Sequence, residues 1–345
     1  MERTIGFGII GCGTIAPWHA DSVARIEGAR LVAVSDVVEE AARKMGQKYQ
    51  ANWYTDYQKI LEREDVDVVC VLTPSGMRKE IVLKAAEAGK HVVVEKPIEV
   101  TLERIDQMIG ACEQAGVKLA VIFQNRFLPG PRRVKEAMEE GKLGKPILGD
   151  AYIKWYRTQQ YYDSGGWRGT WRYDGGGALM NQSIHTIDLL LWIMGPVHSV
   201  SAKMATLAHK IEVEDLAVAT LRFASGALGV IEGSTALYPG FASRLEIHGE
   251  NGSLILKGEQ VVAWELKDGE QIPLPFPPQK AAAGGQADPT KISAEGHYLQ
   301  LKDMVEAVRA NREPLVNGKE GRKAVELIRA IYQSAESGEE VCLPL

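Results

Sequence analysis

The first third of the chain alternates between two patterns of apolar residues. One is a short continuous run rich in Val, Ile and Leu, which is typical of a strand buried on both faces of a sheet. The other repeats apolar residues every three to four positions, as one face of a helix does. This alternation predicts an α/β domain with a doubly wound parallel sheet and right-handed crossovers. Strands are expected at residues 5–10, 31–35, 66–72, 91–94 and 118–123, and helices near residues 18–26, 38–49, 77–88 and 102–114.

A different pattern begins near residue 124. Short apolar segments separated by Ser-Gly, His-Gly, Asn-Gly and Lys-Gly turns predict successive hairpins, and therefore a large, mostly antiparallel open sheet. Strands are expected at residues 147–157, 201–207, 214–223, 228–236, 244–248, 253–256 and 261–265, helices at 132–140, 178–194, 294–311 and 320–337, and a Pro- and Gly-rich loop at 272–289.

The length of 345 residues exceeds the usual size of one core. We therefore expect two domains, an α/β domain at 1–123 and an α+β domain at 124–345. The helix at 178–194 can cover only one face of the antiparallel sheet. The other face has to be buried by another copy of the chain or exposed, so a homodimer or homotetramer formed through this sheet is expected.

Composition and charge argue against several classes of protein. Charged residues make up 25% of the chain and the net charge is −5, with no basic tract of the kind that binds nucleic acid. No apolar stretch is long enough to span a bilayer, and the amino terminus lacks the regions of a signal peptide, so a cytoplasmic location is expected. The four cysteines have no CxxC spacing, so no metal site is expected.

A glycine-rich turn directly follows the first strand. Gly11, Gly13 and Ala16 have the spacing of a dinucleotide fingerprint, in the required place between a strand and a helix. Gly11 is expected to make the tight turn, Gly13 to let the backbone approach a pyrophosphate, and Ala16 to allow close packing of helix on strand. The pyrophosphate is expected at the helix amino terminus, beside Thr14 and Ile15. The first domain is thus predicted to be a dinucleotide-binding Rossmann domain.

Asp36 ends the second strand at about the twenty-residue distance expected for the acid that binds an adenosine ribose. A carboxylate there accepts hydrogen bonds from the ribose hydroxyls and repels a 2′-phosphate, so NAD is preferred to NADP. As an alternative, Asp36 caps the helix at 38–49, and one residue can serve both purposes.

The strand at 91–94 runs into Glu95, Lys96 and Pro97. Ligands of open α/β sheets bind at the carboxyl ends of the strands, and Pro97 restricts the residue before it to extended geometry. Lys96 is therefore expected on a stiff corner at the mouth of a crevice. Thr73-Pro74 follows the strand expected at 66–72, so it is expected at the same ligand-binding edge of the sheet. As an alternative, it forms only a plain turn.

The segment from residue 159 to 177 combines aromatic side chains, arginines and three consecutive glycines. Aromatic faces with arginines suit the apolar faces and hydroxyl edges of a sugar, or an anionic group attached to it. An aromatic minicore under a long loop explains the tryptophans equally well. The residues concerned are Tyr161, Tyr162, Asp163, Trp167, Arg168, Trp171 and Arg172.

On the helix predicted at 178–194, Asn181, His185, Asp188 and Trp192 share one face. A lone histidine in an apolar helix is usually a core residue. His185 instead lies on a polar stripe, near a glycine-rich entry and one turn after an amide, so a catalytic or substrate-binding role is favoured. Asp188 is expected to be structural and to orient a neighbour.

Taken together, these motifs resemble the glucose-fructose oxidoreductase and inositol dehydrogenase family (Gfo/Idh/MocA). The resemblance spans nearly the whole chain, including Glu95-Lys96-Pro97, Gly175-Gly176-Gly177 with the following helix, and the segment from Gly296 to Arg312. It implies an enzyme, an NAD(P)-dependent dehydrogenase that moves a hydride between nicotinamide and a secondary alcohol of a sugar, cyclitol or nucleotide sugar. The loop at 161–171 and Asn181-Gln182 are similar to dehydrogenases that oxidise nucleotide-linked aminosugar uronates at C3.

The resemblance also implies roles for individual residues. Lys96 and His185 handle the hydroxyl proton, with Asn181 beside them. Position 181 is often Asp in relatives, so whether Lys96 or His185 is the base stays open. Expected cofactor-binding residues are Gly11, Gly13, Thr14, Ile15, Asp36, Thr73, Pro74, Glu95, Lys96 and Asn125, and expected substrate-binding residues are Lys96, Arg126, Tyr162, Trp167, Arg168, Asn181 and His185.

Two other functions fit the same scaffold. One is a non-catalytic NAD-bound sensor, which has no need for the pair of Lys96 and His185. The other is an enzyme whose tightly bound NAD is recycled by a second substrate, and it predicts copurified nicotinamide and ping-pong kinetics.

Overall fold

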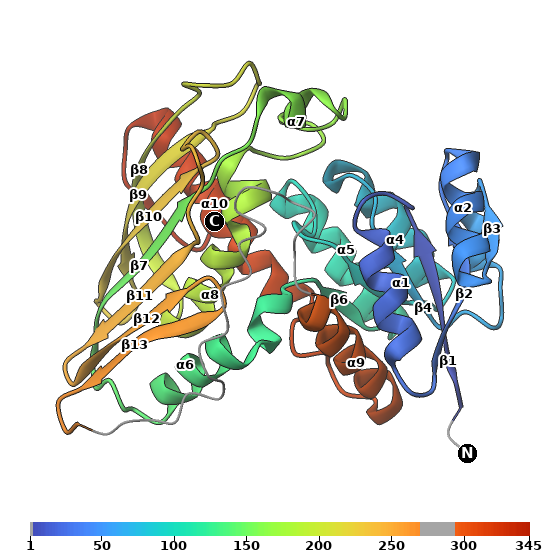
Figure 1. Ribbon diagram of the computed structural model, residues 1–345, viewed down its shortest axis with the longest axis horizontal. Coiled ribbons are helices and arrows are strands. Elements are labelled where there is room, and N and C mark those ends of the chain that lie inside the picture. The colour runs from blue at the N-terminus through green and yellow to red at the C-terminus, as the bar shows by residue number, and fades with distance from the viewer. Residues whose placement is uncertain (1–2, 270–293) are drawn as a thin grey trace. The chain divides into compact units, whose positions relative to one another are not determined.

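The computed structural model describes residues 3–269 and 294–345, in two compact units (Figure 1). The first unit comprises residues 1–124 and 293–322, and the second comprises residues 125–292 and 323–345. The loop expected at 272–289 lies outside the described residues. The domain limits expected from the sequence stay a prediction.

The first unit is built on a six-stranded parallel sheet with the strand order β3-β2-β1-β4-β5-β6 (Figure 1). The order changes direction between β1 and β4, and ligands of such sheets bind at the carboxyl ends of the strands beside this switch. The predicted doubly wound sheet is confirmed, with β3 and α3 as additional short elements. The elements are β1 (Ile5–Ile10), α1 (Ala16–Arg25), β2 (Ala29–Ser35), α2 (Glu39–Tyr49), β3 (Asn52–Tyr54), α3 (Gln58–Leu61), β4 (Val68–Val71), η1 (Ser75–Met77), α4 (Arg78–Glu87), β5 (His91–Val94), α5 (Leu102–Ala115) and β6 (Leu119–Val121).

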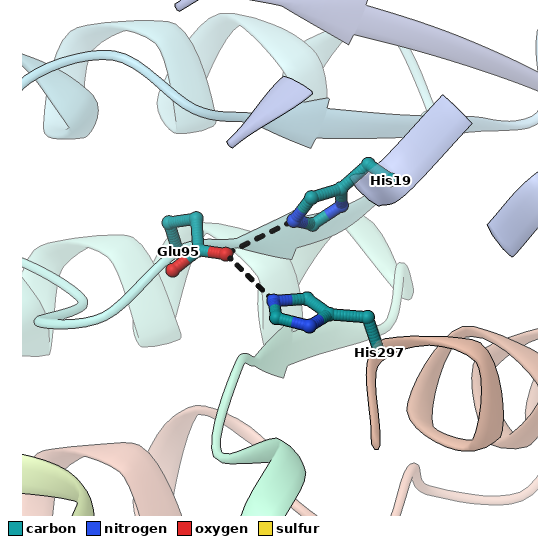
Figure 2. Close-up of side chains that lie close together, drawn as sticks. All are labelled: His19, Glu95 and His297. Atoms are coloured by element: carbon teal, nitrogen blue, oxygen red, sulfur yellow. Dashed lines mark hydrogen bonds and ion pairs between the residues drawn. The ribbon is translucent and has the colours of Figure 1, made fainter. Parts of the chain in front are cut away.

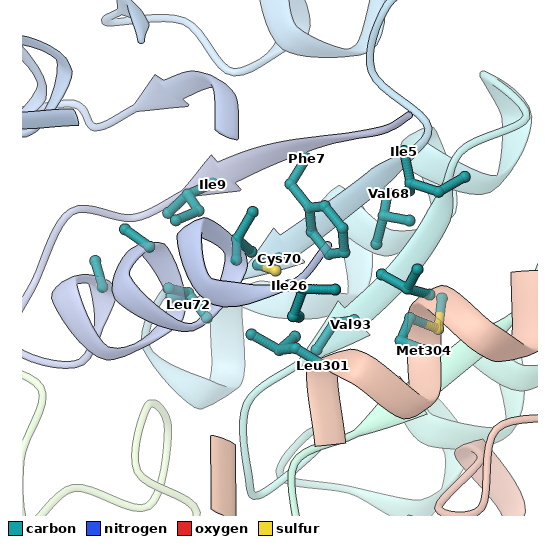
Figure 3. Close-up of a cluster of buried hydrophobic side chains, with 14 of the residues drawn as sticks. Ile5, Phe7, Ile9, Ile26, Val68, Cys70, Leu72, Val93, Leu301 and Met304 are labelled. Atoms are coloured by element: carbon teal, nitrogen blue, oxygen red, sulfur yellow. The ribbon is translucent and has the colours of Figure 1, made fainter. Parts of the chain in front are cut away.

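The core of this unit also contains a helix from near the end of the chain. Phe7 and Ile9 of β1 are fully buried, and Figure 3 shows them in one apolar cluster with Leu301 and Met304 of α9 (Ala294–Ala310). Helix α9 packs against α1. The sequence predicts this helix but not its partner, because an apolar periodicity identifies a buried face without saying what covers it.

The second unit is built on an eight-stranded sheet with the order β13-β12-β11-β7-β10-β9-β8-β14 (Figure 1). Within the described part of this sheet, β7 and β10 pair in parallel and all other neighbours are antiparallel. The predicted mostly antiparallel sheet is therefore confirmed. The strands are β7 (Pro146–Lys154), β8 (Val197–Ala205), β9 (Leu216–Phe223), β10 (Leu228–Ser234), β11 (Arg244–Gly249), β12 (Gly252–Lys257), β13 (Gln260–Leu266) and β14 (Val341–Cys342), and the remaining helices are η2 (Gln124–Phe127), α6 (Pro129–Glu139), α7 (Gln159–Asp163), η3 (Ala178–Ser183), α8 (Ile184–Met194) and α10 (Gly318–Ser337).

Among the residues that the structure describes, α8 covers one face of this sheet. Helix α8 packs against β7 and β11, and the inward-facing Ala151 and Ile153 of β7 are fully buried. The side chains that alternate with them, such as Tyr152, point to the other face. On that face Val218 and Val262 are 43% and 54% exposed.

The helix predicted at 178–194 differs from the expected single α-helix, because it opens with the π-helical turn η3. The side chain and the carbonyl group of Glu214 hold this π-helical turn. Its carboxylate accepts the N–H groups of Gly177 and Leu179, and its carbonyl oxygen accepts that of Ala178. A β-carbon at Gly177 would lie 1.8 Å from this carbonyl oxygen, so only glycine fits there.

Among the residues that the structure describes, no helix is both long enough and apolar enough to cross a membrane.

Candidate active site

The glycine turn after β1 has the geometry that a dinucleotide phosphate requires. Gly11 has a φ of +100°, and a β-carbon there would lie 3.0 Å from the backbone of Leu72, so the tight turn depends on glycine. A β-carbon at Gly13 would meet no atom within 4 Å, which leaves the backbone open to a ligand. No side chain caps the amino terminus of α1, so its dipole can face an anion.

Asp36 is locked to this turn. Its Oδ2 accepts the backbone N–H of Cys12 at 2.8 Å, and its Oδ1 accepts that of Val38, also at 2.8 Å. Each carboxylate oxygen has a second lone pair and can still accept a ribose hydroxyl. The N-cap of α2 is Val38, with no capping hydrogen bond from a side chain of the described residues, so the alternative that Asp36 caps this helix is wrong. Asp36 instead closes the turn before the helix, through the N–H of Val38.

Thr73 lies at the end of β4, on the same edge of the sheet. Its hydroxyl oxygen is buried and has no hydrogen-bond partner in the described part of the chain, and its carbonyl oxygen accepts a bond from Arg78 Nε at 2.9 Å. A buried hydroxyl without a partner is costly, and a ligand at this edge would supply one. The turn at Gly13, Asp36 and Thr73 therefore fit a bound dinucleotide.

At the end of β5, Lys96 is half-buried and joined to Pro97 by a cis peptide bond. Glu95 points inward and is only 5% exposed. Its Oε2 accepts the backbone N–H of Lys96 at 3.1 Å, while Oε1 lies 3.0 Å from His19 Nε2 and 3.5 Å from His297 Nε2 (Figure 2). Sequence reasoning missed both histidines as partners of Glu95, because the three residues lie on separate elements.

In the second unit, a chain of amide hydrogen bonds fixes the orientation of Asn181. Its Nδ2 donates to Asp174 at 2.5 Å, and its Oδ1 accepts from Gln182 Nε2 at 2.9 Å. Gln182 Oε1 in turn accepts from Arg157 at 2.8 Å. The side chain of Asn181 is therefore held in one orientation, with its amide nitrogen directed to an acid. No sequence pattern indicated Asp174, which lies in a turn and accepts this bond.

His185 is half-buried in the first turn of α8, one turn after Asn181. It belongs to the second unit, whereas Lys96 belongs to the first. Their meeting at one substrate carbon stays a prediction, as do the catalytic roles of both residues.

The aromatic segment divides into a buried and a half-buried part. Tyr162 is 6% exposed and shares a 2.7 Å hydrogen bond with Thr235, as the minicore alternative expects, and its burial raises the pKa of its hydroxyl. The guanidinium of Arg168 lies 4.6 Å from the ring centre of Tyr161 and 4.9 Å from that of Trp167, all three half-buried. This stack is accessible to a ligand, and the substrate roles expected for these residues stay predictions.

Arg126 is buried and forms a bidentate ion pair with Asp188, with distances of 2.8 Å from Nε and 2.7 Å from Nη2. Its guanidinium also lies 5.5 Å from the ring centre of Trp192. The orienting role expected for Asp188 agrees with this pair, while the substrate contact expected for Arg126 stays a prediction. Asn125, expected at the cofactor, is half-buried beside it.

Comparison with known proteins adds to this geometry. Residues 5–123 match the oxidoreductase family with an NAD-binding Rossmann fold, and residues 132–255 match the GFO/IDH/MocA C-terminal domain. The chain belongs to the Gfo/Idh/MocA family. The predicted membership of this family is thereby confirmed, and with it the expectation of an NAD-dependent dehydrogenase that acts on a CH–OH group.

Members of this family match the chain over its full length. The myo-inositol 2-dehydrogenase of Thermotoga maritima is 30% identical, covering 97% of this chain and 98% of the relative. The scyllo-inositol 2-dehydrogenase (NAD⁺) of Bacillus subtilis is 28% identical, covering 99% and 97%. Among solved structures, the WlbA dehydrogenase of Bordetella pertussis in complex with NADH and UDP-GlcNAcA is 35% identical, with a TM-score of 0.89 and coverage of 100% and 99%.

Proposed function

We propose that this protein oxidises a secondary alcohol of an anionic sugar with NAD, and that the first candidate substrate is a nucleotide-linked aminosugar uronate oxidised at C3. The proposal of an anionic sugar rests on one observation, the half-buried stack of Arg168 with Tyr161 and Trp167. Aromatic faces pack against sugar rings, and a guanidinium binds a carboxylate or phosphate. The full-length similarity to a dehydrogenase solved with UDP-GlcNAcA supports the same substrate class.

The preference for NAD over NADP rests on Asp36. Its carboxylate is fixed at the end of β2 by two backbone N–H groups before any ligand binds. Ribose hydroxyls can donate to it, whereas a 2′-phosphate brings a like charge to a place where the acid cannot turn away. At about 4 Å, two like unit charges repel by about 4 kcal/mol at an effective dielectric constant of about 20.

NAD, which the turn at Gly13, Asp36 and Thr73 would hold, would supply the acceptor for the hydride of the alcohol carbon, so that the products would be a carbonyl group, NADH and a proton. An alcohol is a very weak acid, so this reaction needs help with the hydroxyl proton. In the proposed mechanism, the Lys96 ammonium stabilises the developing alkoxide and His185 accepts the proton, each contributing roughly 10²- to 10⁴-fold. Asn181, held by Asp174 and Gln182, orients the group beside it without adding a charge.

The absorbance of NADH at 340 nm tests this proposal directly. We expect turnover of UDP-N-acetylglucosaminuronate that exceeds that of UDP-N-acetylglucosamine, a matched control that carries a hydroxymethyl group in place of the carboxylate. Equal rates for the two would contradict a role for the carboxylate, and faster oxidation of myo-inositol would contradict the nucleotide-sugar assignment. Tight NAD binding without turnover of any sugar or cyclitol would support the sensor instead.

The Lys96→Ala variant tests the catalytic assignment. We expect turnover to fall by roughly 10²- to 10⁴-fold, because the alkoxide loses its cationic partner. NAD binding, followed by quenching of tryptophan fluorescence, is expected to persist. Unchanged turnover would refute the role of Lys96.

We also propose that the open face of the second sheet is covered by a second copy of the chain. Val218 and Val262 on this face are exposed, and a depression of about 530 Å³ is lined by Tyr152, Phe241, Ile255 and charged neighbours. Light scattering coupled to size exclusion measures the assembly. A monomer of 37.8 kDa at all concentrations would contradict this assembly.

A further inference from the structure

A buried cluster of three polar side chains lies against the backbone of Lys96, and the proposed mechanism does not use it. Its members come from three elements: His19 from α1, Glu95 from the end of β5, and His297 from α9 (Figure 2). Their exposed fractions are 0%, 5% and 1%. Burying a carboxylate and two imidazoles costs free energy unless their charges and hydrogen bonds are paired. A cluster of this kind next to Lys96 therefore needs a functional explanation.

Glu95 is ionised in this cluster. Burial works to raise its pKa, but the hydrogen bonds from the two imidazoles, His19 and His297, outweigh burial and hold the pKa of Glu95 well below its usual range. For His19, burial lowers the pKa more than the nearby carboxylate raises it, so this imidazole is neutral at neutral pH. Its Nε2–H therefore donates to the Glu95 anion, whose other oxygen is left to hold the N–H of Lys96.

The same three side chains could in principle hold a metal ion, because their ligand atoms lie within 4.8 Å of one another. An imidazole bound to a metal almost always donates its other ring N–H to an acceptor. Nδ1 of His19 and Nδ1 of His297 are both buried and have no hydrogen-bond partner among the residues described. Metal binding through Nε2 would make both Nδ1 atoms buried N–H donors without a partner, whereas donation from Nε2–H to Glu95 leaves them as acceptors. An unsatisfied buried N–H is rarer than an unsatisfied acceptor, so the hydrogen-bonded arrangement is favoured.

A second buried charge, that of Arg78, binds the backbone on either side of Lys96. The guanidinium of Arg78, which is 5% exposed, donates to the carbonyl oxygens of Glu95 and Pro97. Its Nε donates to the carbonyl oxygen of Thr73, so one side chain links the ends of β4 and β5. The N–H of Lys96 and the carbonyl groups of the residues before and after it are thus all held by buried charges.

We propose that Glu95, His19, His297 and Arg78, which we term the Lys96 cradle, are positioning residues that hold Lys96 at the alcohol. The inference rests on the proposed function, since it needs Lys96 to be catalytic. Misplacing a catalytic group by about 1 Å can cost about 10²-fold in rate, so a fixed backbone at Lys96 has direct value for turnover. The cradle acts through Lys96 and contacts no reacting atom.

The Glu95→Gln variant separates this role from simple stabilisation. An amide has only one oxygen, so its NH₂ group must face either the N–H of Lys96 or the two imidazoles, which donate to the carboxylate in the native cluster. We expect kcat to fall by about 10- to 100-fold while the Kd for NAD is unchanged, because the buried carboxylate of Glu95 is taken up by the N–H of Lys96 and by the two imidazoles. An unchanged Kd would also argue against the cofactor contact that the family resemblance implies for Glu95. The matched control is Glu99→Gln, because Glu99 is also fully buried and accepts backbone N–H groups from Lys79 and Val100 and the guanidinium of Arg104, and none of these partners is Lys96. The control is expected to lose stability without a comparable loss of kcat.

A double-mutant cycle then gives the decisive readout. If the cradle acts only through Lys96, adding Glu95→Gln to Lys96→Ala leaves the residual turnover unchanged. A further 10-fold fall in that background, a kcat for Glu95→Gln equal to that of the wild type, or a loss of NAD affinity would each overturn the inference. So would a stoichiometric metal in the purified protein whose removal by a chelator abolishes turnover. If Glu95→Gln does not fold, His297→Gln takes its place in the same cycle; it removes the 3.5 Å contact with Glu95 and the ring contact with His19, but it leaves Glu95 bonded to His19 and to the N–H of Lys96.

The two proposals fail in different ways. Unchanged turnover in Lys96→Ala refutes the proposed function itself. A large effect of Lys96→Ala together with no effect of Glu95→Gln refutes only the cradle.

Discussion

The ion pair between Arg126 and Asp188 allows a prediction whose size follows from the structure. The two side chains are 5% and 1% exposed and make two charge-assisted hydrogen bonds of 2.8 and 2.7 Å. Asp188→Asn keeps the shape of the side chain, but it removes the counter-charge and leaves the guanidinium buried. Breaking a buried pair by removing one partner costs about 3–5 kcal/mol.

This cost is large enough to measure by thermal unfolding. For a unit of this size, each kcal/mol lowers the Tm by about 2–4 °C, so we expect a fall of roughly 6–20 °C in Asp188→Asn. A matched control is Glu232→Gln, which breaks the pair between Lys154 and Glu232. That pair is 2.8 Å long, but its side chains are 44% and 33% exposed, so its loss is expected to cost less than about 1 kcal/mol.

The same experiment decides between two roles for Arg126. If its guanidinium serves the fold, Asp188→Asn and Arg126→Met both lower the Tm. A Tm of Asp188→Asn that matches the control would refute the reasoning about the buried pair. A raised KM for the sugar in Arg126→Met, with an unchanged Tm, would place Arg126 at the substrate instead.

Two further predictions concern Asp36 and Glu214. Asp36→Asn removes the charge that repels a 2′-phosphate but keeps one oxygen for the turn. The repulsion of about 4 kcal/mol corresponds to about 10³-fold, so the ratio of kcat/KM for NADP to that for NAD is expected to rise by up to about 10³-fold. An unchanged ratio in steady-state assays with both cofactors would show that Asp36 does not select NAD. Burial raises the pKa of Glu214 to about 7 from its usual 4.5, against the hydrogen bonds from Leu179, Gly177 and Tyr332. The folded state therefore binds a proton that the unfolded state has released, and this contribution to stability is present below pH 4.5 and is lost as the pH rises through about 7. Denaturant unfolding is expected to show the wild type losing roughly 3 kcal/mol relative to Glu214→Gln between pH 4.5 and 8, and parallel pH profiles for the two would contradict this linkage.

Much of the fold follows from local patterns in the chain. A continuous apolar run such as Ile5–Ile10 can be stable only between two covered faces, and the glycine turn after it requires a φ that other residues avoid. In the second half of the chain, short apolar segments separated by two-residue glycine turns likewise specify hairpins between neighbouring strands. These signals lie within a few residues of the element that they specify, so one sequence is enough to interpret them.

Other features depend on contacts between residues far apart in the chain. The parallel pairing of β7 with β10 and the packing of α9 on α1 have no local signal, because each apolar face is compatible with more than one partner. The π-helical start at Ala178 depends on the Glu214 carboxylate, which reaches it from the segment before β9. Periodicity alone predicts an ordinary α-helix there.

Local patterns in the sequence are enough to select the residues that we propose to carry chemistry: the glycine turn, Asp36, Lys96 and the polar stripe around His185. The groups that surround these residues became known only from the packing of the folded chain. In the fold, the carboxylate of Glu95 points inward to two imidazoles, Arg126 pairs with Asp188, and the amide of Asn181 donates to Asp174. Sequence and fold differ in this way because a side chain's charge and hydrogen-bonding capacity are local properties of the residue. The groups that neutralise or orient that side chain are set by how distant segments pack.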